Sequence, residues 1–172
     1  RIDAAKMAGL IEDKQPDLIV FGKSMFIYPE PVYEAYAVAK DLPQRPVIMY
    51  DMAHVLGLYG AFQKPFEEGA DVVTGSTHKT FFGPQRGIVL TNVDETHGRR
   101  RFLWGFLQKA AFPGAVSNHH LGTLQALLAA AYEFRAFGPA YQQAIHDNAR
   151  GFARALADAG LKVEGDASRG YT

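Results

Sequence analysis

The fold is decided by two stretches, PVIMYDMAH at residues 46–54 and DVVTGSTHK at residues 71–79. Each opens with a short apolar run bounded by proline or a charged residue, which is the pattern of a strand buried in a parallel sheet. Each run is followed by polar side chains, beginning with Asp51 in the first stretch. We therefore predict strands over 46–50 and 71–74, with chemically capable groups at their ends.

Working outward, two further apolar runs at residues 17–22 and 87–91 predict two more strands. Residues 1–14 and 32–42 carry apolar side chains at helical spacing, and a proline follows each segment and ends it. Residues 83–84, Gly-Pro, are predicted to form a turn. Strands that alternate with helices are typical of an open α/β sheet whose strands run mostly parallel.

The second half of the chain is predicted to be mostly helical. Two helices rich in Leu and Ala are expected over 121–137 and 141–159, separated by Gly138-Pro139. Gly160 is a natural end for the second helix, and residues 161–163 are predicted to open another strand.

The composition excludes several classes of protein. The 172 residues suit one domain, and 48% hydrophobic with 21% charged residues is ordinary for a globular chain. Lys plus Arg and Asp plus Glu both number 18, and this zero net charge argues against a general nucleic-acid binder. With no cysteine, a disulfide, a thiolate metal site and a cysteine nucleophile are all excluded. The sequence lacks an apolar stretch of about 18 residues, so no transmembrane helix is predicted.

Polar residues follow three of the predicted strands at the point where each strand ends. Ser24 follows the first, Asp51 and His54 follow the second, and residues 76–79 follow the third. Ligands of parallel α/β sheets bind beyond the carboxyl ends of the strands, where these side chains converge. The adjacent His119 and His120 have no acidic residue nearby at ligand spacing, so we predict no metal site.

Lys79 and Asp51 together point to one kind of chemistry. A lysine is ordinarily a solvated surface residue, but Lys79 lies among small and aromatic residues beside a histidine. An amine desolvated in that way becomes a nucleophile that attacks aldehydes. Asp51 could cap a helix, or it could hold a protonated pyridine nitrogen. A lysine for the aldehyde and an aspartate for the pyridinium are what pyridoxal phosphate enzymes require.

The chain resembles the serine hydroxymethyltransferase family in the segments DMAHVLGL at 51–58 and ADVVTGSTHKT at 70–80, followed by Gly83-Pro84. The resemblance continues through residues 112–114 and the helices after them, so it covers most of the chain. It implies the fold of fold-type I pyridoxal phosphate enzymes. The chain would form the central part of their large domain, a three-layer α/β/α arrangement around a mostly parallel sheet.

The resemblance also implies a role for each matching residue. Lys79 would hold pyridoxal 5′-phosphate as the internal aldimine, Asp51 would pair with the pyridine nitrogen, and His54 would lie beside the phenolic oxygen. Ser76 stands where the family usually has threonine and would act beside the lysine. His78 would approach the cofactor or its phosphate.

Further positions match less closely. Ser24 corresponds to a family serine near the cofactor and the substrate carboxylate. Gln85 stands directly after Gly-Pro, where the family usually has arginine, and Arg86 comes one residue later. Where family glycines reach the cofactor phosphate of a neighbouring subunit, this chain offers Ser117 and Asn118. These departures favour a divergent branch, such as the threonine transaldolases, as an alternative.

The resemblance therefore implies a pyridoxal-phosphate-dependent transferase that cleaves or forms the Cα–Cβ bond of a β-hydroxy amino acid such as serine. The reaction would run through the lysine aldimine and a glycine quinonoid, with tetrahydrofolate as a candidate one-carbon acceptor. The alternatives are a threonine transaldolase or aldolase and a non-catalytic homologue; Lys79 and Asp51 argue against the latter. The expected protein is a cytoplasmic homodimer with a small amino-acid substrate and neither nucleic-acid nor membrane partners.

The domain organisation follows from the same resemblance. We expect residues 1–160 to form part of the cofactor-binding large domain, with its N-terminal phosphate-binding part outside this chain. Residues 161–172 would begin the C-terminal small domain. The chain starts without Met and stops where a strand could begin, so we expect an internal piece of a longer protein.

Overall fold

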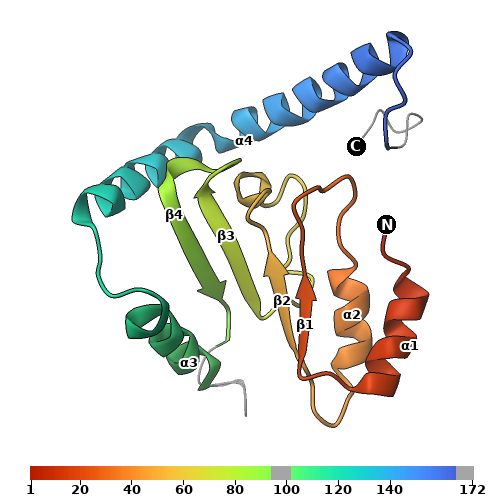
Figure 1. The fold of residues 1–172 in the computed structure, drawn as a ribbon, viewed down its shortest axis with the longest axis vertical. Coiled ribbons are helices and arrows are strands. Elements are labelled where there is room, and N and C mark those ends of the chain that lie inside the picture. The colour runs from red at the N-terminus through yellow and green to blue at the C-terminus, as the bar shows by residue number, and fades with distance from the viewer. Residues whose placement is uncertain (94–101, 166–172) are drawn as a thin grey trace.

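The computed structural model of the protein describes residues 1–93 and 102–165. Its centre is a four-stranded sheet with the order β1-β2-β3-β4 (Figure 1). The strands are β1 (Leu18–Phe21), β2 (Val47–Asp51), β3 (Val72–His78) and β4 (Phe82–Thr91). The first three run parallel and β4 runs antiparallel to β3, which confirms the predicted α/β fold with a mostly parallel sheet.

Helices lie beside the sheet and across one of its ends (Figure 1). They are α1 (Ala4–Lys14), α2 (Val32–Ala39), the short η1 (Leu56–Leu58), α3 (Leu103–Lys109), η3 (Ala110–Ala115) and α4 (Leu121–Asp158). The first helix begins at Asp3, whose carboxylate accepts hydrogen bonds from the backbone N–H groups of Ala5 and Lys6 at 3.1 Å. This capping arrangement satisfies donors that a helix start otherwise leaves unpaired.

The two faces of the sheet differ in how they are covered. Alternate strand residues such as Phe21, Ile48 and Tyr50 form a buried core with α1 and α2. On the other face, Leu18 and Val20 of β1 are 51% and 55% exposed. On this second face α3 lies beside β4, where Trp104 and Val89 line one cavity. Helices thus lie on both faces, as expected for α/β/α layers, but within the described residues the second face is covered only near β4.

The hairpin formed by β3 and β4 corrects two predictions. The third strand was expected over 71–74 and a turn at Gly83-Pro84, yet β3 continues to His78 and the turn lies at residues 79–81. The antiparallel ladder with β4 extends both strands, and the Thr77 hydroxyl donates to the Pro84 carbonyl at 2.6 Å. Among the described strands β4 lies at the edge of the sheet, a position at which a proline such as Pro84 is tolerated.

Helix α4 corrects a third prediction, because it runs unbroken through Gly138-Pro139. The contacts on both sides of this pair explain its continuity. Phe134 before it and Tyr141 after it both pack on Phe82, with ring centroids 5.7 and 5.0 Å apart. In Figure 1, α4 crosses the end of the sheet where β3 ends and β4 begins.

The chain after α4 also differs from the prediction. Gly160, with φ of +83°, ends the helix as expected, because only glycine adopts this backbone conformation easily. Residues 161–165 do not form the predicted strand. An extended segment becomes a strand only by pairing with another, and this one has no such pairing in the part of the chain that the structure describes.

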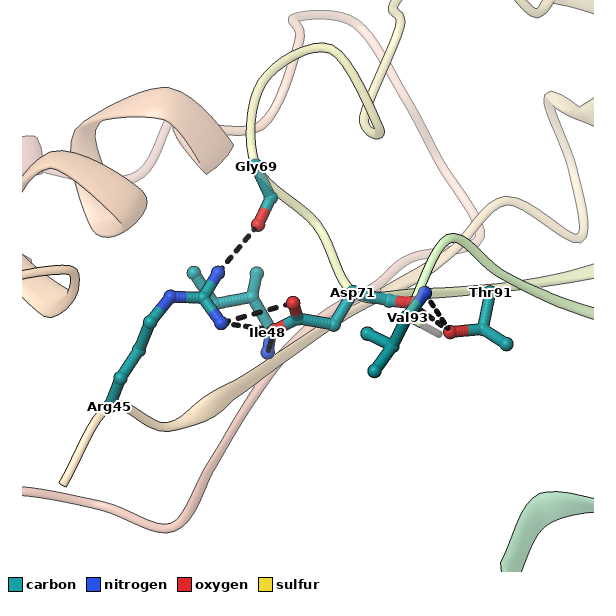
Figure 2. Close-up of polar contacts among 6 residues, drawn as sticks. All are labelled: Arg45, Ile48, Gly69, Asp71, Thr91 and Val93. Atoms are coloured by element: carbon teal, nitrogen blue, oxygen red, sulfur yellow. Dashed lines mark hydrogen bonds and ion pairs between the residues drawn. The ribbon is translucent and has the colours of Figure 1, made fainter. Parts of the chain in front are cut away.

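Asp71, just before β3, anchors the opposite end of the sheet (Figure 2). It is 3% exposed, and its carboxylate accepts two hydrogen bonds from one Arg45 nitrogen at 2.9 and 3.0 Å and one from the Ile48 N–H at 2.9 Å. Arg45 also donates to the Gly69 carbonyl, and the Thr91 hydroxyl donates to the Asp71 carbonyl. The Asp71 side chain therefore links β2 to the loop before β3, and the Asp71 backbone carbonyl binds Thr91 of β4.

We expect the substitution Arg45→Ala in the full-length protein to lower the unfolding free energy by about 3 kcal/mol, because it leaves a buried carboxylate without its cation. Lys64→Ala is the control, since Lys64 pairs with Glu67 at an exposed site and should cost less than about 1 kcal/mol. Thermal denaturation of the two variants would measure the difference. Equal melting temperatures would contradict the anchoring role of Asp71.

Candidate active site

Asp51 ends β2 at the carboxyl edge of the sheet. It is half-buried, and its Oδ1 accepts a hydrogen bond from the Ala53 N–H at 2.9 Å. This contact closes a local turn rather than capping a helix. Asp51 pairs with Thr74 of β3, and because side chains alternate along strands it shares a face with Thr74 and Ser76. This is the sheet face opposite the core.

The reactive residues of β3 lie at its end and in the turn after it. Ser76 is half-buried within the strand, whereas His78 is exposed at its last position. Lys79 occupies the turn between β3 and β4, and its side chain is exposed. The residues that the structure describes therefore do not form the desolvated surroundings expected for Lys79.

Thr80, the residue after Lys79, links the two strand ends. Its hydroxyl donates to the His54 carbonyl at 2.9 Å and accepts from the Gly57 N–H at 3.1 Å. The link joins the turn that follows Asp51 directly to the turn that contains Lys79. In this way the structure brings Asp51, His54 and Lys79 to the carboxyl edge of the parallel strands.

Gly57 makes this approach possible. A Cβ atom built on Gly57 would lie 2.1 Å from the Thr80 carbonyl oxygen and 2.5 Å from the Phe81 backbone nitrogen. Real Cβ atoms do not approach backbone atoms so closely, so any other residue would force the two segments apart. Gly57 is thus required by a close backbone contact.

Helix α4 holds both segments from a third side. The Tyr141 hydroxyl donates to the Thr80 carbonyl at 2.8 Å. The side-chain amide of Gln142 donates to the carbonyls of Gly57 and Tyr59 at 3.0 and 3.2 Å. The backbones on both sides of the site are therefore tied to one helix.

Ser24 lies at the same edge, in the loop after β1, and is exposed. Its loop is held by an ion pair between Lys23 and the buried carboxylate of Glu30, with Nζ and Oε1 2.6 Å apart. The Gln63 side chain binds both backbone groups of Glu30 and accepts from the Tyr50 hydroxyl at 2.9 Å. Burial, with Glu30 and Glu68 nearby, raises the pKa of Tyr50, which keeps this hydroxyl protonated as a donor.

Among the described residues, no contact brings Ser117 and Asn118 to this edge. Both are exposed in the segment between η3 and α4. Asn118 lines a cavity with Arg86 and Trp104 near β4, and its Oδ1 accepts from the His119 N–H.

Four residues of this arrangement were missed by the sequence interpretation. The sequence pattern predicts Gly57 only as a break in an irregular segment, and it places Thr80 in a motif without giving it a role. Tyr141 and Gln142 follow a Gly-Pro pair that suggested the start of a new helix, and no local signal connects them to the site. Only the hydrogen bonds show their involvement.

Within residues 1–93 and 102–165, no group of three or more His, Asp or Glu side chains could hold a metal ion. Nor does any helix in those ranges have the length and apolar character needed to cross a membrane.

Comparison with known proteins decides the family. The protein-family model described as serine hydroxymethyltransferase matches residues 1–170 of this chain. The chain belongs to the serine hydroxymethyltransferase family. It is 45% identical over 176 residues to the serine hydroxymethyltransferase of Pyrococcus horikoshii, covering 99% of this chain and 39% of that protein. The enzyme of Korarchaeum cryptofilum is also 45% identical, over 164 residues that cover 94% of this chain and 36% of that protein.

Membership in the serine hydroxymethyltransferase family confirms the resemblance carried by the motifs at 51–58 and 70–80. The chain spans 39% of the length of its Pyrococcus relative, so the activity of the whole protein is treated below as a proposal.

We expect Gly57→Ala in the full-length protein to lower the unfolding free energy by at least about 2 kcal/mol, because the new methyl group overlaps the Thr80 backbone. Gly151→Ala is the matched control, since Gly151 lies in α4 with nothing within 4 Å of the added Cβ. There alanine should stabilise the helix by about 0.5–1 kcal/mol. Thermal melting and hydrogen exchange of residues 54–57 and 79–81 would measure both effects, and unchanged exchange in Gly57→Ala would contradict the close contact.

Proposed function

We propose that the protein containing this chain is a pyridoxal-phosphate-dependent serine hydroxymethyltransferase. The observation that carries the proposal is the placement of Lys79 and Asp51 at the ends of adjacent strands, linked through Thr80. Family membership supports the same activity, because the relatives from Pyrococcus and Korarchaeum are named serine hydroxymethyltransferases.

The residues present fit the proposed cofactor. Lys79 offers an exposed primary amine for its aldehyde. Asp51 uses Oδ1 for the Ala53 N–H, and its Oδ2 makes no hydrogen bond to any residue that the structure describes, so it can accept from a pyridinium nitrogen. Because a nearby negative charge favours a protonated base, Asp51 would hold the proton at that nitrogen.

Pyridoxal phosphate, when bound, supplies an aldehyde and a ring that accepts the electrons of a broken bond at the substrate α-carbon. The chain's own residues would position the reactants around it. His54 would lie beside the cofactor, Ser76 and His78 would offer hydrogen bonds next to Lys79, and Ser24 would face the cofactor and the substrate carboxylate.

The proposed reaction transfers the hydroxymethyl carbon of serine to tetrahydrofolate, leaving glycine and releasing the serine hydroxyl oxygen as water. The threonine transaldolase alternative is not favoured, because the family model and the relatives named above are serine hydroxymethyltransferases. A non-catalytic role is not favoured either, since Lys79 and Asp51 are both retained.

The organisation of the whole protein belongs to the same proposal. We assign residues 1–160 to the large domain and residues 161–172 to the start of the small domain. The proposed assembly is a cytoplasmic homodimer, in which Ser117 and Asn118 would reach the cofactor phosphate of the partner subunit. Their exposure on the segment before α4 supports this assignment.

We expect Lys79→Ala in the full-length protein to abolish the visible absorption band of the bound cofactor and its fixation by borohydride, because no amine remains at that position. Lys64→Ala, which removes an exposed lysine elsewhere, is the control and should retain both properties. Peptide mapping after reduction would identify the modified residue. A cofactor adduct on another lysine would overturn the assignment.

The choice of reaction can be tested with two substrate pairs. The full-length protein should convert serine with tetrahydrofolate, and this turnover should exceed that of threonine with an aromatic aldehyde. Both rates would be measured at equal cofactor occupancy. Turnover of threonine with the aldehyde, and none of serine with folate, would move the assignment to a transaldolase.

A further inference from the structure

The proposed chemistry needs a fixed spacing between Lys79 and Asp51. The lysine amine must reach an atom of a cofactor whose ring Asp51 holds, and an error of about 1 Å in such an arrangement can slow a reaction a hundredfold. Yet Lys79 is exposed in the turn between β3 and β4. Its position is therefore set by the contacts that hold the backbone of this turn.

Those contacts form a closed ring with α4. Tyr141 binds the carbonyl of Thr80, the residue next to Lys79, and Gln142 binds the carbonyl of Gly57. Thr80 and Gly57 are themselves joined by the hydrogen bond from the Gly57 N–H to the Thr80 hydroxyl. Two successive residues of one helix thus hold the turn that contains Lys79 and the segment that follows Asp51.

We propose that Tyr141 and Gln142 are positioning residues that fix the Lys79 turn against the segment following Asp51. This inference rests on the proposed function and adds residues to its site. Neither side chain needs to touch the substrate or cofactor, because each acts through a backbone carbonyl at 2.8 or 3.0 Å.

The hydrogen-bonding role can be separated from packing. The Tyr141 ring packs edge-on against Phe82, with centroids 5.0 Å apart, and this contact survives in Tyr141→Phe. Gln142→Met keeps the length of the side chain and removes its donors. The neighbouring Gln143 provides a matched control, because its amide binds only the exposed Asp147 on the same helix in the described structure.

The experiment compares Tyr141→Phe, Gln142→Met, their combination and Gln143→Met in the full-length protein loaded with pyridoxal phosphate. We expect the combined variant to lower kcat about tenfold to a hundredfold, with KM for serine little changed, because alignment rather than binding is lost. The pH midpoint of the cofactor's visible band should also shift, since the environment of Lys79 changes. Gln143→Met should change neither property.

The outcomes separate this inference from the function on which it rests. If the unmodified protein shows neither a visible band nor serine turnover, the proposed function fails. If it shows both, while the combined variant keeps the same pH midpoint and kcat, the positioning role is overturned. If the combined variant fails to fold, Tyr141→Phe alone tests the positioning role, because it removes only one oxygen atom. It must then shift the pH midpoint of the visible band and lower kcat, and an unchanged midpoint and kcat would overturn the role.

Discussion

The contact between Gly57 and Thr80 is the constraint on which the site depends. A Cβ at position 57 would lie 2.1 Å from the Thr80 carbonyl oxygen, so the two turns can touch only where one residue has no side chain. This approach lets the Thr80 hydroxyl accept from Gly57 and donate to His54 at once. The edge of the sheet is therefore organised by backbone contacts, and the reactive side chains project from a fixed frame.

The two ends of the sheet have different tasks. At the amino end of β3, the buried carboxylate of Asp71 binds Arg45 and the Ile48 N–H, and so fixes β3 beside β2 (Figure 2). At the carboxyl end, Lys79 remains exposed. At the amino end, the buried ion pair of Asp71 and Arg45 fixes the register of β3 against β2. The carboxyl edge keeps its polar side chains available for a ligand. Changes at the two ends should accordingly affect stability and chemistry differently.

The sequence predicted the parts that depend on local pattern. The apolar runs before Ser24, Asp51 and Ser76 predict strands because each is short, continuous and bounded by proline, glycine or a charged residue. The extent of β3 and the continuity of α4 were not predicted. Both depend on partners distant in the chain, such as the packing of Phe134 and Tyr141 on Phe82.

The same distinction applies to the site. Asp51 and Lys79 could be predicted because each lies shortly after a predicted strand and carries a characteristic functional group. Tyr141 and Gln142 act on carbonyls 61 and 85 residues away in sequence, and a tyrosine or glutamine on a helix gives no sign of such a target. For the proposed reaction this division is useful: a lysine that must attach to and release a cofactor needs a mobile side chain. The position of the lysine must then be fixed through its backbone, and Thr80, Gly57 and α4 hold that backbone in place.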